Sequence, residues 1–471
     1  MTYDRRTVLR GSAATFMAFS ALACGSTANS RSANAGLDLI EDPQGMLDLP
    51  EGFSYRLLTR TGKPMSDGLM TPGRPDGMAC FAHDSDPGKI VLVRNHENFA
   101  DMSHGMPFGE GNALLSRVPD GKLYDARRYD GSKGVPFYGG TSTLVVDMAS
   151  GEVVRDHLSL IGTVGNCAGG ATPWGSWLSC EEQMLKPGEE DAQQLHGFVF
   201  EVPATATGLV DPVPLKAMGR FAHEATATDP ASGIVYQTED SHTGLFYRFI
   251  PDVPGELARG GRLQALAIAG DDSADLRNWP LDWSRPNARK VAVGETLPVR
   301  WIDMDDVESP DADLAARGFA AGAAMFSRGE GMGFGTQADG RAAVFFNSTQ
   351  GGYFGTGQVW RHDPAPDGSE GGGTLTLLYE SPGPDTLDLC DNLAVSPWGD
   401  LILCEDGRGD NFLRGLTPEG TIYDLARNAH EDRAEFCGAC FSPDGSTLFV
   451  NVQEPGFTYA ITGPWERLRT S

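Results

Sequence analysis

The sequence Ser442-Pro-Asp-Gly-Ser-Thr-Leu-Phe-Val-Asn-Val-Gln-Glu454 indicates the fold most directly, because its pattern occurs twice. The other copy, Ser396-Pro-Trp-Gly-Asp-Leu-Ile-Leu-Cys-Glu-Asp406, begins 46 residues earlier. In both copies a Ser-Pro-x-Gly turn leads into an apolar strand, and the strand ends in oxygen-bearing side chains. A repeat of about 40 to 50 residues that contains several strands is typical of a β-propeller blade.

Four other apolar strands end in the same way. Their polar ends are Asn95-His-Glu-Asn98, Glu181-Glu182, Thr238-Glu-Asp240 and Asn347-Ser-Thr349. Short β-branched runs bounded by turn residues continue from residue 53 onward, and beyond the N-terminus a helical period is visible only around residues 311–317. We therefore predict an all-β fold, a six-bladed β-propeller with inserted loops and few short helices. Five or seven blades, or two β-sandwiches with similar hairpins, are the alternatives.

The acidic strand ends predict a metal centre. In a propeller the corresponding strand ends converge on one face, and carboxylates a few Å apart cannot all stay ionised unless cations balance them. Carboxylate and amide oxygens suit calcium, which takes roughly six to eight oxygen ligands. For any single glutamate a solvated loop end is the competing interpretation, so the argument depends on the repetition.

Two cysteine patterns stand out. Cys167 lies in Gly165-Asn-Cys-Ala-Gly-Gly170, where the glycines allow a close approach of backbone to a ligand. A thiolate among oxygen ligands would recruit a softer metal such as iron, whereas a plain buried cysteine is the alternative. Cys437-Gly-Ala-Cys440 has the CxxC spacing, but it lacks a second pair or a histidine partner. Local packing or a local disulfide is therefore the favoured interpretation of that pair.

The charge excludes one class of partner. The chain has 64 Asp and Glu against 37 Lys and Arg, a formal net charge of −27, and a polyanion such as nucleic acid would be repelled. Hydrophobic residues make up 40% and charged residues 21%, which is the composition of a globular protein and not of a disordered one.

The N-terminus resembles an export signal. Arg5-Arg6 precedes a short uncharged run that ends in Ala21-Leu-Ala23, as in twin-arginine signal peptides. We predict a signal peptide at 1–23, a flexible segment at 24–50 and a single propeller domain at 51–471. The expected partner in export is the twin-arginine machinery, and the expected location is periplasmic or secreted, with a lipid anchor at Cys24 as the alternative to a free N-terminus. We expect a monomer without a transmembrane segment in the mature chain.

Longer motifs resemble the PhoX family of bacterial alkaline phosphatases. They cover nearly the whole mature chain, and the pattern NCxxGxTPWG followed by CEE is the most specific of them. The motifs are Arg94-Asn-His-Glu97, Asn166-Cys-Ala-Gly-Gly-Ala-Thr-Pro-Trp-Gly-Ser-Trp177, Cys180-Glu-Glu182, Gly219-Arg-Phe-Ala-His-Glu224, Thr238-Glu-Asp240, Ser327-Arg-Gly-Glu-Gly331, Asp391-Asn-Leu393, Cys404-Glu-Asp-Gly407 and Gly438-Ala-Cys-Phe-Ser-Pro-Asp-Gly445.

The resemblance implies an exported six-bladed propeller that hydrolyses phosphomonoesters with an iron and calcium cluster. It implies Cys167 as the thiolate ligand of iron, with Glu224 and Glu330 as further iron ligands, and Arg328 as the residue that holds the substrate phosphate. The calcium ligands it implies are Glu97, Glu181, Glu182, Glu239, Asp391 and Glu405. The chain is shorter than the best-known members, and several motifs are spelled differently.

These roles agree with the chemistry of phosphoryl transfer. Closely spaced metal ions neutralise the equatorial oxygens and position the nucleophile, and an arginine adds a bidentate grip. Two other functions compete: a calcium-dependent lactonase or phosphotriesterase-like propeller, and a calcium-stabilised binding propeller without catalysis. A Ser/His/Asp mechanism is disfavoured, since the sequence has no Gly-x-Ser-x-Gly motif and only 9 histidines.

Overall fold

The computed structural model describes residues 37–101, 105–126, 135–280, 290–337, 340–365 and 371–468. All of them belong to one compact unit that extends from Ser32. The predicted signal peptide and Cys24 lie outside the described residues. Within those residues no helix is long and apolar enough to cross a membrane.

The strands form five antiparallel sheets. The first sheet contains β4 (Pro75–Ala82), β5 (Lys89–His96), β6 (Gly139–Asp147) and β7 (Glu152–Thr163), and the second contains β8 (Asn166–Ala171), β9 (Ser176–Glu181) and β10 (Val199–Pro203). The third has the order β11 (His223–Thr228), β12 (Val235–Glu239), β13 (Phe246–Pro251), β14 (Gly261–Ile268), β15 (Thr296–Asp303), β19 (Thr374–Glu380), β18 (Gln358–Asp363), β17 (Ala342–Ser348) and β16 (Gly329–Thr336). The fourth has the order β1 (Leu39–Ile40), β2 (Leu47–Pro50), β23 (Ile422–Asn428), β22 (Phe412–Leu416), β21 (Leu401–Glu405) and β20 (Cys390–Val395), and the fifth contains β24 (Phe436–Phe441), β25 (Thr447–Val452), β26 (Phe457–Thr462) and β3 (Ser54–Arg60).

Helices are few and short in the described part of the chain. The α-helix α2 (Leu314–Ala320) overlaps the one region with a helical period in the sequence. The 3-10 helices are Glu110–Asn112, Leu115–Arg117, Glu189–Asp191, Lys216–Met218, Leu257–Arg259 and Trp465–Arg467. The prediction of an all-β, propeller-like fold with few helices is confirmed.

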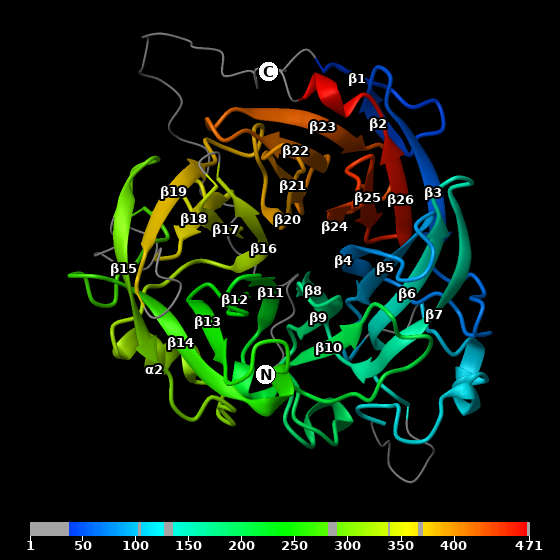
Figure 1. The fold of residues 1–471 in the computed structure, drawn as a ribbon, viewed down its shortest axis with the longest axis horizontal. Coiled ribbons are helices and arrows are strands. Elements are labelled where there is room, and N and C mark those ends of the chain that lie inside the picture. The colour runs from blue at the N-terminus through cyan, green and yellow to red at the C-terminus, as the bar shows by residue number, and fades with distance from the viewer. Residues whose placement is uncertain are drawn as a thin grey trace, which may run out of the picture. The chain divides into compact units, whose positions relative to one another are not determined.

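Six inner strands surround the centre of this unit. β4 contacts β8, β8 contacts β11, β11 contacts β16, β16 contacts β20, β20 contacts β24, and β24 contacts β4 again, so that the strands close a ring (Figure 1). The hydrogen-bonded sheets are nevertheless five in number. The reason is that β15 pairs with both β14 and β19 and joins two four-stranded units into one nine-stranded sheet.

Apolar side chains fill the space between neighbouring sheets. Along β21, Leu401 and Leu403 pack into one cluster, whereas Ile402 and Cys404 pack into the cluster on the other face. A strand that is covered on both faces reads as a continuous apolar run because neither set of alternating side chains meets water. This burial explains why the sequence marks the second strand of each unit so clearly.

The N-terminal strands complete the C-terminal sheets. β3 pairs with β26, and β2 pairs with β23. Leu37, Leu47 and Leu49 are buried in the same apolar cluster as β23 and β25. The described part of the segment predicted as flexible at 24–50, residues 37–50, thus packs against the last two sheets, where its leucines bury apolar area.

Candidate metal centre

Each inner strand places its second residue at the same point of the ring. In the first sheet Pro75 of β4 pairs with His96, and a β-bulge follows before Met78. The same register shift occurs at the start of β8, β11, β16 and β20, and one residue later in β24. Bulges re-aim the side chains next to them. The second residues, which we call the inner ring, are Asp76, Cys167, Glu224, Glu330, Asp391 and Cys437.

A second set of side chains follows the second strand of each unit. The backbone N–H of each of these residues donates to the carbonyl of the residue just before the inner strand, at 2.8 to 3.3 Å. We call this set the outer ring: Glu97, Glu182, Asp240, Thr349, Asp406 and Gln453. The residues that accept these hydrogen bonds are called the lead residues: Arg74, Gly165, Ala222, Arg328, Leu389 and Glu435.

Members of these three sets form overlapping groups that suit a metal ion. Within each group one ligand atom from every residue lies within 4.8 Å of the others. The groups are Cys167 with Glu182 and Glu224, Glu224 with Asp240 and Glu330, Asp76 with Glu97 and Glu435, and Asp391 with Asp406 and Glu435. The acidic strand ends that were recognised in the sequence thus meet in space.

The structure brings together six of the predicted metal ligands. Cys167, Glu182, Glu224 and Glu330 belong to two groups that share Glu224. Glu97 and Asp391 belong to the other two groups, which share Glu435. All six residues lie in the inner or outer ring.

Three predicted calcium ligands lie elsewhere. Glu181 accepts hydrogen bonds from the backbone N–H of Val164 and Gly197, at 3.0 and 2.8 Å. Glu239 accepts from the N–H of Leu245 and the hydroxyl of Tyr247. Because side chains alternate along extended backbone, the residue just before the outer ring points away from it. Glu181 and Glu239 therefore fix loops of their own units.

Glu405, the third of these residues, has the same structural role. Its carboxylate accepts from the N–H of Asp388 and Phe412, both at 3.0 Å, and pairs with Arg414 Nε at 2.9 Å. Burial raises the pKa of Glu405 to about 7, although Arg414 opposes that shift.

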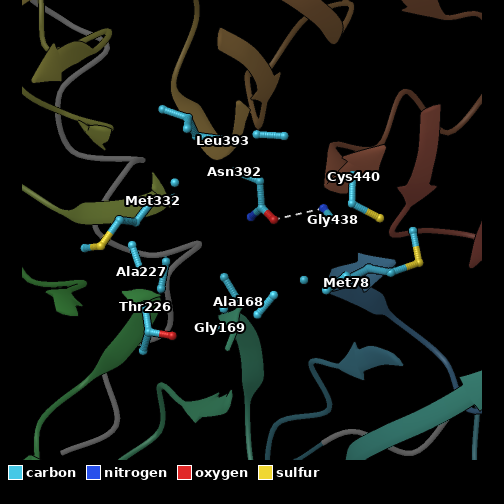
Figure 2. Close-up of a pocket in the computed structure, with 18 of the residues that line it drawn as sticks. Met78, Ala168, Gly169, Thr226, Ala227, Met332, Asn392, Leu393, Gly438 and Cys440 are labelled. Atoms are coloured by element: carbon cyan, nitrogen blue, oxygen red, sulfur yellow. Dashed lines mark hydrogen bonds between the residues drawn. The ribbon is translucent and has the colours of Figure 1, made fainter. Parts of the chain in front are cut away.

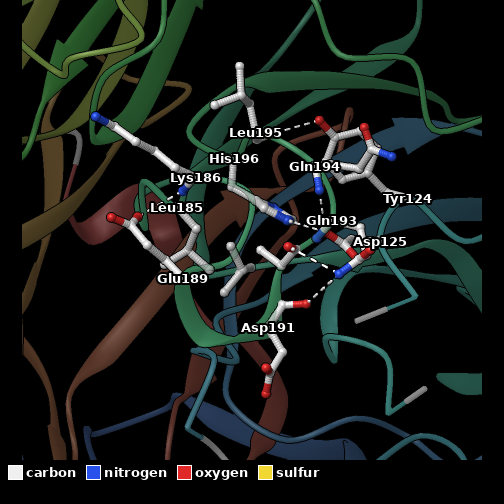
Figure 3. Close-up of polar contacts among 12 residues, drawn as sticks. Tyr124, Asp125, Leu185, Lys186, Glu189, Asp191, Gln193, Gln194, Leu195 and His196 are labelled. Atoms are coloured by element: carbon white, nitrogen blue, oxygen red, sulfur yellow. Dashed lines mark hydrogen bonds and ion pairs between the residues drawn. The ribbon is translucent and has the colours of Figure 1, made fainter. Parts of the chain in front are cut away.

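Glu181 also belongs to a buried network with His196 and Asp125, and Figure 3 shows His196 and Asp125 of this network. His196 lies between two carboxylates, with Nδ1 2.6 Å from Glu181 Oε1 and Nε2 3.2 Å from Asp125 Oδ2. Asp125 Oδ2 also accepts from the backbone N–H of Gln193 and Gln194. Both carboxylates thus bind His196 and backbone N–H groups of the surrounding loops.

Sequence reasoning missed four carboxylates of the centre. Asp240 and Asp406 stand directly after Glu239 and Glu405 in the quoted motifs, so a shift of one residue would have identified them. Asp76 is the second residue of β4, and Glu435 directly precedes β24. No apolar run ends at either residue. Only the equivalence of β4 with β8, and of β24 with β16, reveals their position.

The charges of the groups are not balanced within the protein. Burial, and then the neighbouring carboxylates, raise the pKa of Asp76, Glu224 and Glu435 well above the usual range. Burial likewise raises the pKa of Asp391, to about 7. Oxygen ligands that repel one another in a buried site, together with the Cys167 thiol, fit bound cations.

Two arginines contact these groups. Arg328 donates to Asp240 with Nε at 2.8 Å and Nη2 at 3.2 Å, and its Nη2 lies 2.5 Å from Glu330 Oε1. Arg74 contacts Glu97 through Nη2 at 2.5 Å and Glu454 through Nη1 at 3.0 Å. Both are lead residues with positive φ, 52° for Arg328 and 47° for Arg74. Arg74 was not anticipated from the sequence.

Below the inner ring the same strands line a cavity of about 260 Å³ (Figure 2). The residue that follows each inner-ring residue borders it, and all but one are glycine or alanine: Gly77, Ala168, Ala225, Gly331, Asn392 and Gly438. Asn392 Oδ1 accepts from the N–H of Gly438 at 2.8 Å. The cavity wall contains no carboxylate, so the charged chemistry lies at the strand ends.

Comparisons with known proteins agree with the fold. The sequence profile of the family Alkaline phosphatase PhoX matches residues 36–456. The sequence match and the propeller-like fold thus define the chain as a member of a phosphatase family. The chain belongs to the alkaline phosphatase PhoX family.

A solved structure of PhoX from Pseudomonas fluorescens, in complex with the transition state analogue vanadate, is similar to the chain with a TM-score of 0.63 and 18% identity. The match covers 91% of this chain and 98% of that one. The gluconolactonase XC5397 from Xanthomonas campestris matches with a TM-score of 0.34 and 11% identity, over 87% of this chain and 95% of that one. No curated protein sequence matches the chain.

Proposed function

We propose that this chain is an exported phosphatase that hydrolyses phosphomonoesters with iron and calcium bound in its inner and outer rings. The observation that carries the proposal is Arg328, whose guanidinium lies against Asp240 and Glu330, two members of one candidate ligand group. An arginine held at that place can grip a phosphate that approaches the metals. Membership of the PhoX family supports the same chemistry.

The donor chemistry separates the two kinds of metal. Cys167 with Glu182 and Glu224 offers a thiol among carboxylates, which suits iron. Asp391 with Asp406 and Glu435, and Asp76 with Glu97, offer oxygens alone, which suit calcium. When bound, the ions would neutralise the phosphate oxygens and activate the nucleophile.

Residues of the chain would do the remaining work. Asp240 and Glu330 hold the guanidinium of Arg328 with its plane fixed, which lowers the entropic cost of binding phosphate. The outer-ring backbone hydrogen bonds fix the ligand side chains before a cation arrives. The small residues below the inner ring let the six strands approach closely enough for the ligands to meet.

We also propose that the nine-stranded sheet counts as two blades, β11–β14 and β16–β19, so that the propeller has six. The equivalent hydrogen bonds at the six lead residues support this count.

We further propose twin-arginine export, from Arg5-Arg6 in the sequence. Replacing both arginines by lysine should retain the protein in the cytoplasmic fraction; unchanged periplasmic recovery would contradict export.

The test of function uses protein purified from the periplasm. Elemental analysis should find iron and calcium, and p-nitrophenyl phosphate should be hydrolysed at alkaline pH. Arg328→Ala should lower turnover by about 10²–10³-fold, whereas the control Arg361→Ala should not, since Arg361 pairs with Asp363 on β18 away from the rings. Metal-loaded protein without phosphatase activity, or equal activity in Arg328→Ala, would contradict the proposal. Calcium without iron would favour the lactonase-like or binding alternatives.

A further inference from the structure

Arg74 holds Glu97 at three points. The backbone carbonyl of Arg74 accepts a hydrogen bond from the N–H of Glu97 at 2.8 Å. The side chain of Arg74 adds two more, because Nε donates to the backbone carbonyl of Glu97 at 3.0 Å and Nη2 donates to its carboxylate oxygen Oε2 at 2.5 Å. One residue thus fixes both the backbone and the side chain of this outer-ring carboxylate.

Gln453 binds the same carboxylate and also a second one. Its amide nitrogen Nε2 donates to Glu97 Oε2 and to Asp76 Oδ2, each at 2.9 Å. An amide nitrogen carries two hydrogens, so one glutamine satisfies both acceptors at the same time. All three side chains are buried. Gln453 therefore sets the distance between an outer-ring carboxylate and an inner-ring carboxylate.

These contacts leave one oxygen of each carboxylate to a cation. Oδ1 of Asp76 is buried and has no hydrogen-bond partner, and no described residue donates to Oε1 of Glu97. A buried acceptor without a donor is unfavourable, more so when it is charged. Asp76, Glu97 and Glu435 each offer an oxygen within 4.8 Å of the others. The donors thus occupy the far oxygens and leave the group open to a shared positive ligand.

The position of Arg74 in the ring suits this role better than a contact with phosphate. At the equivalent place in another unit, the lead residue Arg328 precedes an outer-ring threonine, Thr349, which has no carboxylate to hold. Arg74 has Glu97 there, and its remaining Nη1 pairs with Glu454 at 3.0 Å. Its positive charge reduces the repulsion among the three carboxylates before a cation arrives.

We propose that Arg74 and Gln453 are positioning residues of the metal centre, which hold Glu97 and Asp76 so that their other oxygens bind one calcium ion together with Glu435. This inference rests on the proposed function, in which this group binds calcium, and it assigns a role to two residues that are not ligands. Partners that orient metal ligands typically change metal affinity by about 10–100-fold. Their loss should act through calcium and not through the substrate.

Calcium titration of the metal-free protein by calorimetry tests these roles. Arg74→Met and Gln453→Met remove the donors at similar volume, and each should weaken one calcium site by about 10–100-fold and leave the bound iron unchanged. Arg74→Lys keeps the charge and should recover part of the affinity. The matched controls are Arg56→Met, whose exposed side chain pairs with Glu152, and Gln264→Met, a buried glutamine on β14; both should bind calcium as wild type does.

Hydrolysis of p-nitrophenyl phosphate separates positioning from substrate contact. In Arg74→Met and Gln453→Met, kcat should fall at low calcium and recover at saturating calcium, while KM stays at the wild-type value. Wild-type calcium affinity in both variants, or a loss of kcat that calcium does not restore, would overturn the positioning role. Should Arg74→Met not fold, Gln453→Met decides alone, because its two hydrogen bonds do not involve Arg74.

The two measurements also distinguish this inference from the proposed function. If wild type binds calcium, the variants weaken it and no ester is hydrolysed, the phosphatase fails and the positioning role stands. If phosphate is released but the variants bind calcium as wild type does, the positioning role fails alone. If metal-free wild type takes up no calcium, both fail.

Discussion

Arg74 and Arg328 occupy the same backbone position in two different units of the fold. The carbonyl of Arg74 accepts from the N–H of Glu97, and the carbonyl of Arg328 accepts from the N–H of Thr349, both at 2.8 Å. Their side chains are also similarly accessible, 16% and 17% exposed. They differ in their partners: Arg328 contacts Asp240 and Glu330, two members of one candidate ligand group, whereas Arg74 contacts Glu97 of another group and Glu454, which belongs to none.

Replacing Arg328 should reduce phosphatase turnover strongly. Loss of a charged group that contacts the reacting phosphate is expected to lower kcat/KM by about 10²–10³-fold, the scale of removing one preorganised donor. Arg328→Lys should recover only part of this, because an ammonium cannot make a planar bidentate contact. Steady-state kinetics and the affinity for inorganic phosphate provide the measurement. Unchanged phosphate affinity in Arg328→Ala would show that the guanidinium does not contact phosphate.

The neighbours Glu405 and Asp406 should respond to substitution in opposite ways. Glu405→Gln removes the charge that pairs with the buried Arg414, and we expect a loss of about 3 kcal/mol in unfolding free energy. Asp406→Asn removes a charge from a crowded group, so it should leave the stability of the metal-free protein unchanged or higher. Urea unfolding of both metal-free variants checks this, and bound calcium should fall only in Asp406→Asn. Equal effects of the two substitutions would contradict the division of roles.

The pH dependence of stability should carry the signature of His196. Burial alone lowers its pKa, but Glu181 and Asp125 outweigh burial and raise the pKa to about 9. A histidine whose folded pKa lies above its unfolded pKa, near 6.5, binds a proton more tightly when folded. Its contribution, on the order of 3 kcal/mol, is therefore fully present below about pH 6.5 and lost as the pH rises through about 9.

The comparison of wild type with His196→Asn isolates that contribution. The difference in unfolding free energy between the two proteins should be largest at pH 6 and should shrink toward pH 9.5. Chemical denaturation at several pH values measures it. A difference that grows with pH would mean that His196 is neutral in the folded protein.

The close contact between inner strands should make Gly170 intolerant of a side chain. A Cβ at Gly170 would lie 2.0 Å from the backbone oxygen of Thr226 on β11, which cannot move without breaking the ring. We expect Gly170→Ala to cost about 1–3 kcal/mol. Gly208→Ala is the control, since a Cβ there meets nothing within 4 Å. Thermal unfolding that shows equal midpoints for both variants would refute the steric argument.

The sequence predicted the strand ends well for a specific reason. The second strand of each unit is buried on both faces, so it stands out as an apolar run, and the polar residue after it is easy to see. Glu97 and Glu182 were identified in this way, and both lie in the outer ring. At Glu239 and Glu405 the same signal identified the residue just before the outer-ring residue. The sequence does not show which residue of an acidic pair has its side chain directed toward the centre.

The inner strands gave no comparable signal. β4, β8, β11 and β24 are rich in glycine and alanine and carry a bulge, so neither alternation nor an apolar run marks them. Cys167, Glu224 and Glu330 came from the family resemblance, and Asp76 and Glu435 were not identified as candidate ligands. The count of sheets also escaped the sequence, since the pairing of β15 with β14 and β19 joins segments far apart in the chain.

The sequence by itself determined the all-β class, the family and the acidic character of the strand ends. These properties depend on local patterns of burial and on motifs made of residues that are adjacent in the sequence. The tertiary structure alone decided which carboxylates face one another, that Arg74 stands where Arg328 stands, and that Gln453 joins Asp76 to Glu97. Such relationships arise because bulges and strand register set the direction of each side chain across a closed ring, and register between distant strands is not written in any single stretch of the chain.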